Sequence, residues 1–315
     1  MIPLIVTSLG QKGMDTPKAI YGIIGYPVGH SLSPLLHNTA FEALGVNAEY
    51  KLFPLKEDEL KDFFAGLKEK TSPIFGLNVT VPYKEKIIEY MDSLSPYAQK
   101  ARAVNTIVIA RDRMLKGFNT DGAGFLSHLT ELGIPTAGKR IVLLGAGGTA
   151  RSIISVLCLL PQRPHSILVY NHHPEKTHQL IQDMGQRMDV GVVRPVASVE
   201  DLNIELRDAR QGADLLINTT PLGLNKDDPC PVAEGVLHSN LWVYDVIYNP
   251  SETLLLKRAK AKGAKTANGL GMLFYQGVLS FEHWADVELD PKVKNKMRER
   301  LLKVQGRPGL KRGPK

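Results

Sequence analysis

The sequence predicts an α/β protein with two domains, the second of the Rossmann type. Segments typical of strands and helices alternate along most of the chain, which is the pattern of folds with a mostly parallel sheet. The turn GAGGTA at 145–150 directly follows a strand-like segment and opens a helix-like one, as in nucleotide-binding domains. The length of 315 residues allows two domains, since a domain typically has about 100–200 residues.

The first half of the chain predicts an αβ domain of its own. Its expected strands are apolar or alternating runs, at 19–25, 49–55 and 74–81. The expected helices lie at 33–44, 57–69 and 83–91. In the first of these helices, Ser33 is expected at the N-cap, Pro34 in the first turn and Gly45 just past the end. The turn RDR is expected to join a β-hairpin formed by 103–110 and 114–120.

A second αβ series follows a helix expected at 122–133. Its strands are continuous apolar runs, as expected for strands covered on both faces, at 139–145, 166–171, 213–219 and 241–248. Its helices are expected at 148–160, 174–184, 252–263 and 266–284, the last beginning with glycines.

These elements predict a domain change near Asp121. The expected domains are a substrate domain at 17–121, completed by 269–303, and a nucleotide-binding domain at 122–268. The expected loose termini are 1–16 and 304–315, with Met14 as an alternative start to Met1.

Composition narrows the class of protein. With 43% hydrophobic and 23% charged residues, the chain resembles soluble globular proteins, and no apolar run approaches the roughly 20 residues of a membrane helix. Its two cysteines, Cys158 and Cys230, form no pair motif, which argues against a disulfide framework or a zinc site and fits a reducing cytoplasm. We therefore expect a cytoplasmic protein without a metal.

The net charge of +7 invites a nucleic-acid interpretation, but its distribution argues against one. Ten of the 39 Lys and Arg residues lie in 291–315, with Glu299 as the single acid there. This stretch has no aromatic residue on which a base could stack. We interpret it as a solvated helix end followed by a frayed terminus, with a nucleic-acid tail as the alternative.

The residues of GAGGTA suit a bound dinucleotide. Gly145 allows the tight turn, Gly147 lets the backbone approach a pyrophosphate, and Ala150 lets the helix pack close to the sheet. The N-terminus of the helix adds N–H groups and partial positive charge for the phosphates.

The end of the next strand, YNHHPEK at 170–176, bears on the choice of cofactor. An acid here would bind the ribose 2′-hydroxyl of NAD, but none occurs before Glu175 and no arginine occurs at all. His172 and Lys176 could meet a 2′-phosphate. The segment therefore favours NADP, with NAD as the alternative.

The stretch GLNVTVP has a polar face. Leu77, Val79 and Val81 are expected on one face of a strand, and Asn78 and Thr80 on the other. Open α/β sheets bind ligands at the carboxyl ends of their parallel strands, so this polar face is a candidate substrate site.

Other polar residues occupy comparable positions. Ser31 and Ser33 stand at a helix start, where two hydroxyls would suit a carboxylate. Asn105 and Asp121 stand at strand ends, and Asp121 is also a candidate N-cap of the following helix. Lys84 falls at a predicted helix start, where acids are preferred, and the alternative interpretation is an ordinary surface lysine.

Together with INTTPLGL at 217–224, DVIYNP at 245–250 and NGLGMLFYQG at 268–277, these stretches resemble the shikimate dehydrogenase family. The resemblance runs from about Tyr21 to Trp284, and HSLSP, NVTVPYK, NTDG and GMLFYQG are its most specific motifs. It implies a substrate domain and a nicotinamide domain. It also implies the reversible reduction of 3-dehydroshikimate to shikimate with NADPH, on the route to chorismate and the aromatic amino acids.

The resemblance implies a role for each matching residue. Lys84 and Asp121 would be the catalytic acid/base pair. The substrate-binding residues would be Ser31, Ser33, Asn78, Thr80, Asn105, Tyr248 and Gln276. The cofactor-binding residues would be Gly145, Gly147, Gly148, Ala150, Asn171, His172, Lys176 and Gly269.

One position departs from the family. NADP-using members usually carry an arginine after the second nucleotide strand, where this chain has Asn171, His172 and His173. The alternatives are therefore a quinate/shikimate dehydrogenase that uses NAD(H), or a catalytically inactive sensor of the same fold. The two serines of HSLSP favour shikimate over quinate, and the presence of both Lys84 and Asp121 favours an enzyme. We expect a small-molecule substrate, no nucleic acid or membrane partner, and a homodimer as a candidate assembly.

Overall fold

The structure is a computed structural model that describes residues 17–208 and 212–305. The predicted leader at 1–16, with its candidate start at Met14, and nearly all of the predicted tail at 304–315 lie outside the described residues. No helix in the described part of the chain is long and apolar enough to cross a membrane.

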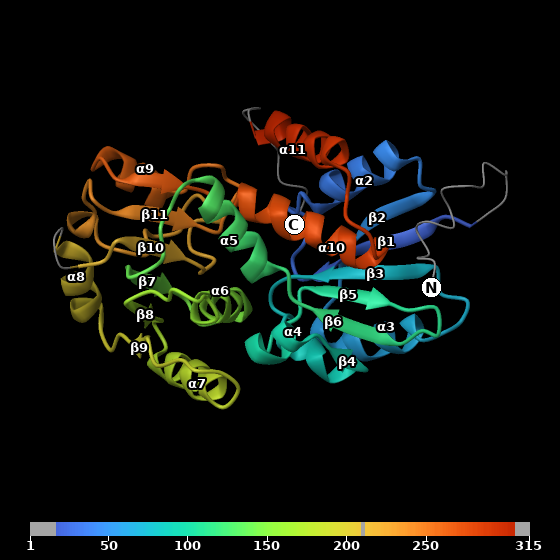
Figure 1. The fold of residues 1–315 in the computed structure, drawn as a ribbon, viewed down its shortest axis with the longest axis horizontal. Coiled ribbons are helices and arrows are strands. Elements are labelled where there is room, and N and C mark those ends of the chain that lie inside the picture. The colour runs from blue at the N-terminus through green and yellow to red at the C-terminus, as the bar shows by residue number, and fades with distance from the viewer. Residues whose placement is uncertain (1–16, 209–211, 306–315) are drawn as a thin grey trace. The chain divides into compact units, whose positions relative to one another are not determined.

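The chain divides into two compact units (Figure 1). The first unit is Met1–Thr120 together with Phe274–Lys315, and the second is Asp121–Leu273. Each unit is built on its own β-sheet and carries its own helices, which confirms the predicted α/β fold class. The finer domain limits expected from the sequence stay a prediction.

The first unit contains a mixed sheet. Its strands are β1 (Ala19–Gly25), β2 (Ala48–Pro54), β3 (Ile74–Val79), β4 (Ser93–Leu94), β5 (Thr106–Ile109) and β6 (Leu115–Phe118). They follow the order β2-β1-β3-β5-β6-β4, with β1 parallel to β2 and β3, and β5 antiparallel to β3 and β6. The predicted hairpin is therefore confirmed as β5 and β6. The helices are α2 (Ser33–Leu44), α3 (Leu60–Leu67), α4 (Pro96–Ala101), the later part of α10 (Leu270–Ala285), and α11 (Pro291–Gln305).

The helices of this unit are held by apolar side chains at helical spacing. In α3, the buried residues Leu60, Phe64 and Leu67 recur on one face and join the core of the unit. Phe41 of α2 packs against Phe281 of α10, with 5.2 Å between the ring centroids. These contacts place α10, from the end of the chain, in the same core as α2.

The last helix, α11, packs against α2 (Figure 1). Val293, Met297 and Leu301, each four residues after the last, form its buried stripe. The charged face of this helix is solvated, as expected for 291–315, because Lys292, Lys296 and Arg300 lie exposed between the residues of the buried stripe.

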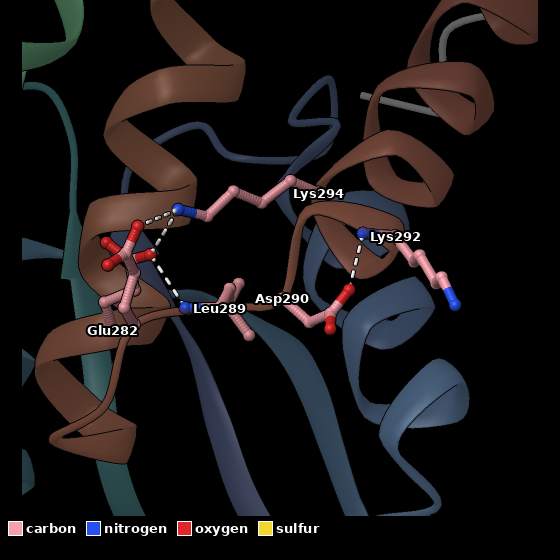
Figure 2. Close-up of polar contacts among 6 residues, drawn as sticks. Glu282, Leu289, Asp290, Lys292 and Lys294 are labelled. Carbon is pink, nitrogen blue, oxygen red and sulfur yellow. Dashed lines mark hydrogen bonds and ion pairs between the residues drawn. The ribbon is translucent and has the colours of Figure 1, made fainter.

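Figure 2 shows the hydrogen bonds and the ion pair that hold the turn between α10 and α11. The Glu282 carboxylate accepts a hydrogen bond from the N–H of Leu289 at 2.9 Å and pairs with the Lys294 Nζ at 2.8 Å. Asp290 Oδ1 accepts the N–H of Lys292 at 2.7 Å at the helix start. Lys294, one of the basic residues of the 291–315 stretch, thus joins α11 to α10.

The second unit contains a parallel sheet. Its strands are β7 (Arg140–Leu144), β8 (Ser166–Tyr170), β9 (Val193–Pro195), β10 (Leu215–Asn218), β11 (Trp242–Asp245) and β12 (Lys265–Ala267). All neighbours in the order β12-β11-β10-β7-β8-β9 run parallel. The helices are α5 (Asp121–Glu131), α6 (Gly148–Cys158), α7 (Pro174–Gly185), α8 (Val199–Arg207), α9 (Leu254–Ala261) and the start of α10.

The sheet of the second unit is covered on both faces, as its apolar strands predict. Along β7, Ile141 and Leu143 join one apolar cluster, whereas Val142 and Leu144 join another. Side chains alternate between the two faces of a strand, so the two clusters lie on opposite faces. This is the doubly wound arrangement of a Rossmann-type domain.

The predicted helix at 83–91 does not form. The chain turns there and then forms only a short 3₁₀ helix, Lys86–Tyr90. In an α-helix the carbonyl of Lys84 would accept an N–H four residues later, but here it accepts the N–H of Val104 at 2.7 Å. Lys84 therefore stands in a turn, and the conflict between a lysine and a helix start disappears.

The ends of two other helices also differ from prediction. α2 begins at Ser33 with Leu32 at the N-cap, so Ser33 does not cap the helix. The Ser31 Oγ accepts the N–H of Ser33 at 3.2 Å instead. α5 begins at Asp121, which is therefore its first residue and not its N-cap. The expected helix at 266–284 starts later, because 265–267 pair as β12.

Short elements escaped prediction. The strands β4, β9 and β12 have two or three residues each, too few to show a period. β3 is shorter than expected, and Val81 beyond its end is 54% exposed and does not share the buried face of Val79. The helix α8 was also not predicted, although its sequence carries a helix-start signal. Ser198 stands at the N-cap, where its Oγ accepts the N–H of Asp201 at 3.0 Å.

Candidate active site

The sheet of the first unit brings four chain segments to one edge. β1 and β3 run parallel with Ile24 beside Val79, so the segments that follow both strands leave at the same edge. β3 is antiparallel to β5 with Asn78 beside Thr106, and β5 is antiparallel to β6 with Thr106 beside Phe118. The segment before β5 and the segment after β6 therefore reach this edge as well.

Most of the predicted substrate-side residues of the first unit lie in these segments. They are Ser31, Ser33, Thr80, Lys84 and Asn105. Thr80 and Lys84 are half-buried, and the N–H of Thr80 donates to the carbonyl of Ile24 at 2.9 Å. Asp121 is the residue at which the second unit begins. Its pairing with Lys84 stays a prediction.

The amide of Asn78 is buried and oriented by protein groups. The Tyr50 hydroxyl donates to its Oδ1 at 2.7 Å. Its Nδ2 donates to the Ser280 Oγ at 2.9 Å and to the carbonyl of Asn105 at 3.1 Å. Buried amides need such partners at both ends, and these bonds tie Asn78 to the segment before β5.

The amide of Asn105 is oriented in the same way. Its Oδ1 accepts the N–H of Thr120 at 2.8 Å, and a backbone N–H can only donate, so this contact fixes which end is oxygen. The Nδ2 then donates to the Thr120 Oγ1 at 2.9 Å and to the Gln276 Oε1 at 3.3 Å. Asn105 thus links α10 to the residue that precedes Asp121.

Two buried hydroxyls join these amides into one network. The Thr106 Oγ1 and the Ser280 Oγ are 2.7 Å apart. The Ser280 Oγ also lies 2.9 Å from the carbonyl oxygen of Gln276, and the Thr106 Oγ1 lies 3.0 Å from the Asn105 Oδ1. Each hydroxyl has a single proton, so one of them donates to the other, and the second donates to its own amide or carbonyl oxygen. Neither hydroxyl was a predicted site residue.

In the second unit, GAGGTA folds as the predicted strand–turn–helix. Gly145 has a φ of 107°, and a Cβ there would lie 2.5 Å from the Thr219 Oγ1, so this position requires glycine. Gly147 is the N-cap of α6, which begins at Gly148, and a Cβ on Gly147 would meet nothing within 4 Å. Ala150 is fully buried. The backbone is therefore open at Gly147 and closely packed at Gly145.

The loop after β8 carries the residues predicted to decide the cofactor. The Asn171 Oδ1 accepts the N–H of His173 at 2.9 Å, which shapes the turn into α7. The rings of His172 and His173 lie 4.1 Å apart, and the His173 Nδ1 lies 3.4 Å from the Glu175 Oε1. His172 and Lys176 are exposed, so a cationic side chain and an imidazole are accessible at this strand end.

Asp245, the last residue of β11, is a functional candidate that the sequence patterns did not single out. It is fully buried and accepts hydrogen bonds from the Thr253 hydroxyl at 2.7 Å and the N–H of Ile247 at 3.1 Å. Burial raises the pKa of Asp245 to about 6, although its hydrogen bonds act in the opposite direction. A buried carboxyl at the carboxyl end of a parallel strand stands where such sheets bind ligands.

Gly269 stands where the chain enters α10. Its N–H donates to the carbonyl of Ile247 at 3.1 Å. A Cβ at this position would clash with the carbonyl oxygen of Val246, so glycine is needed for the close approach of two backbones. Tyr248, a predicted substrate residue in the same loop as Val246, is half-buried.

In the part of the chain that the structure describes, no group of three or more His, Cys, Asp or Glu side chains could hold a metal ion. Cys158 and Cys230 are free thiols. Burial raises the pKa of the Cys158 thiol to about 11, and a thiol of this kind is a poor nucleophile.

Known proteins resemble this chain along most of its length. The sequence model described as the shikimate dehydrogenase substrate binding domain matches residues 23–107. A protein named shikimate dehydrogenase (NADP(+)) from Moorella thermoacetica is 40% identical over 296 residues, which cover 93% of this chain and 97% of the relative. The chain belongs to the shikimate dehydrogenase family.

Two solved structures of shikimate dehydrogenases share the fold. The Thermus thermophilus enzyme, in complex with NADP(H) and shikimate, has a TM-score of 0.74 at 34% identity, covering 90% of this chain and 99% of that one. The Listeria monocytogenes enzyme, in complex with shikimate and NAD, has a TM-score of 0.77 at 32% identity, covering 92% and 99%. These relatives confirm the resemblance and the fold drawn from the motifs.

The shikimate dehydrogenase motifs predict the residues that would contact the ligands, but they miss several buried polar residues that form hydrogen bonds behind them. Thr106 and Ser280 were missed in the first unit, and in the second Asp245 and Asn218, whose Nδ2 donates to the Asp245 Oδ1 at 3.1 Å. A signal existed for the second pair, because each is a polar residue that ends an apolar strand, LLIN and WVYD. The same logic led from NVTVP to Asn78.

Proposed function

We propose that this member of the shikimate dehydrogenase family catalyses the reversible NADPH-dependent reduction of 3-dehydroshikimate to shikimate. The relative from Moorella thermoacetica carries the corresponding name, and the Thermus thermophilus relative was solved with NADP(H) and shikimate. The observation in this chain that carries the proposal is the buried amide–hydroxyl network around Asn105, at the sheet edge that Lys84 also reaches. Oriented amides are what a site needs to discriminate ring hydroxyls.

The substrate carboxylate is assigned to the start of α2. The Ser31 Oγ accepts the N–H of Ser33, and a hydroxyl that accepts this bond still has its own proton to donate. Two hydroxyls and the positive end of a 12-residue helix suit an anion. The ring hydroxyls are assigned to the remaining predicted residues, Asn78, Thr80, Asn105, Tyr248 and Gln276.

The proton is assigned to Lys84. Reduction of the ring ketone requires a hydride at the carbon and a proton at the oxygen. NADPH, when bound, supplies the hydride. The Lys84 ammonium would give its proton to the oxygen, and in the reverse direction its amine would take the proton from the hydroxyl. The Asp121 carboxylate would hold the ammonium by a charge-assisted hydrogen bond.

The glycine turn of the second unit fits a dinucleotide. A Cβ at Gly147 would meet nothing within 4 Å, so the backbone there is open to the approach of a pyrophosphate. Gly145, Gly147, Gly148 and Ala150 would form this cradle, and Gly269 would approach the cofactor from the start of α10. The helix N-terminus of α6 would offer N–H groups to the phosphates.

We propose NADP as the first choice of cofactor, with NAD as the second. No carboxylate follows β8 directly, and Asn171, His172 and Lys176 would surround a 2′-phosphate. The histidine is a weaker determinant than the arginine usual in the family, because imidazole lacks the fork of N–H donors with which a guanidinium pairs a phosphate. The Listeria monocytogenes relative was solved with NAD, which supports keeping the alternative.

The deciding experiment follows the formation of reduced cofactor with shikimate or quinate, each with NADP or NAD. We expect the highest kcat/KM for shikimate with NADP. A higher kcat/KM for quinate with NAD would favour the quinate/shikimate alternative. Binding of shikimate without turnover by any pair would favour the inactive sensor and refute the proposal.

Two broader expectations accompany the proposed function. A cytoplasmic location fits a biosynthetic enzyme that uses a soluble cofactor. A homodimer is the candidate assembly, and sedimentation equilibrium of the full chain would measure it.

A further inference from the structure

We propose that Asp245 is a positioning residue, which ties the loop after β11 to the loop after β10 and thereby sets the place of Tyr248. This inference rests on the proposed function only in giving Tyr248 a substrate to contact. The tether itself is a property of the second unit. Asp245 opens the stretch DVIYNP, but the family resemblance implies no role for it.

The carboxylate stands at the centre of the loop that carries Tyr248. Its Oδ2 accepts the Thr253 hydroxyl at 2.7 Å, and its Oδ1 accepts the N–H of Ile247 at 3.1 Å. These two bonds reach the beginning and the end of the 246–253 segment. Tyr248 lies between them, so the path of its backbone is constrained from both sides.

The same carboxylate reaches the neighbouring loop. The Asn218 Nδ2, at the end of β10, donates to the Asp245 Oδ1 at 3.1 Å. Asn218 in turn accepts the N–H of Thr220 at 3.1 Å and donates to the carbonyl of Leu222 at 3.2 Å. The loop after β10 is thus folded around an asparagine that Asp245 orients.

Close packing reinforces the tether. Gly223 has a φ of 113°, and a Cβ there would lie 3.2 Å from Thr253 and 3.4 Å from Ile247. The two loops therefore touch where the carboxylate joins them. Both loops follow parallel strands at the edge where doubly wound sheets bind dinucleotides. A displacement of either loop would therefore change its contacts with a ligand bound there.

The chemistry of the residue fits positioning better than simple packing. Burying a carboxylate is unfavourable unless hydrogen bonds compensate it, and burial raises the pKa of Asp245 to about 6. An apolar residue of similar size would fill the space at less cost, but it could not accept three hydrogen bonds from two loops. What Asp245 contributes is therefore the geometry of those loops.

The test uses the full chain and compares substitutions at two buried threonines. Thr253→Val keeps the shape but removes the hydroxyl, which donates to Asp245 and also accepts the N–H of Leu256 at the N-cap of α9, whereas Thr253→Ser restores both bonds. Thr177→Val on α7 is the matched control, since Thr177 is buried and its Oγ1 makes no hydrogen bond among the described residues. Asp245→Ala removes the tether while leaving Thr253 free to cap α9.

We expect Thr253→Val and Asp245→Ala to raise KM for shikimate about tenfold, the effect of losing a hydrogen bond to a charged group. Thr253→Ser should return KM to within about twofold of the parent, and Thr177→Val should leave it unchanged. Unchanged KM in both disruptive variants, or no rescue by serine, would overturn the inference.

Amide hydrogen exchange separates the tether from the proposed function. We expect faster exchange at Ile247 and Thr220 in Thr253→Val than in the parent, with no change in Thr177→Val. A chain that oxidises no shikimate but shows this pattern would refute the proposed function and keep the tether. Active enzyme with unchanged exchange at Ile247 would refute the tether.

Discussion

Replacing Lys84 by alanine tests the proposed acid/base role most directly. Lys84 contributes to the fold through its carbonyl, which accepts the N–H of Val104 at 2.7 Å, and alanine keeps that carbonyl. The substitution therefore removes the ammonium group with little disturbance of the backbone. Positioned proton transfer typically contributes about 10²–10⁴-fold, so we expect kcat to fall by that factor, or about 3–5 kcal/mol. KM for shikimate should change by no more than about threefold.

The assay is steady-state kinetics with shikimate and NADP, together with thermal unfolding of each variant. Lys86→Ala is the matched control, because Lys86 lies two positions further on, is exposed, and pairs with Glu57 at 2.5 Å. An exposed pair of this kind contributes little to stability, so this variant should keep both kinetic constants. A large rise in KM with kcat untouched in Lys84→Ala would show a binding role and refute the reasoning.

Three further predictions concern the second unit. His172→Arg should raise the NADP/NAD ratio of kcat/KM about tenfold through a charged hydrogen bond to the 2′-phosphate, whereas His178→Arg on α7 should not; equal ratios would count against the assignment. Gly145→Ala should lower the free energy of unfolding by about 1–3 kcal/mol, because position 145 has a positive φ. Gly147→Ala should have the same free energy of unfolding as the parent but a weaker affinity for NADP, which calorimetry would measure. The pKa of the Asp245 carboxyl is raised from 3.8 to about 6. Its contribution to the stability of the fold is therefore complete below pH 3.8 and is lost as the pH rises through 6. The parent should therefore lose up to about 3 kcal/mol of unfolding free energy relative to Asp245→Asn as the pH rises from 4 to 8. Denaturant unfolding of both proteins would measure this, and a difference that does not change with pH would contradict it.

Features with local causes could be predicted from the sequence. β7, the turn at Gly145 and α6 follow one another within a short stretch, and each has its own signal: an apolar run, a glycine pattern and a helix start. The hairpin of β5 and β6 has the same local character. Where a signal was local but a distant bond competed with it, prediction failed, as at Lys84, whose carbonyl is taken by Val104.

The support of the candidate site could not be predicted, because its contacts are distant in the chain. Asn78 donates to Ser280 across 202 positions, and Asn105 donates to Gln276 across 171. A period within one segment carries no information about such partners. Motif resemblance found Gln276 only because it lies in a stretch shared with the family, and it was silent on Thr106 and Ser280.

Asn78 and Thr80 show what the structure adds to a correct pattern. Both were expected on one polar strand face, and the pattern treats them alike. Asn78 lies within β3 and is 4% exposed, with its amide bound to Tyr50, Ser280 and the Asn105 carbonyl. Thr80 lies one residue beyond the strand and is half-buried. A ligand at this edge would reach Thr80 without breaking a buried network, whereas contact with Asn78 would require exchanging bonds that hold Asn105. Of these two proposed substrate ligands, Thr80 is therefore the more accessible, whereas Asn78 also holds the segment before β5 through the Asn105 carbonyl.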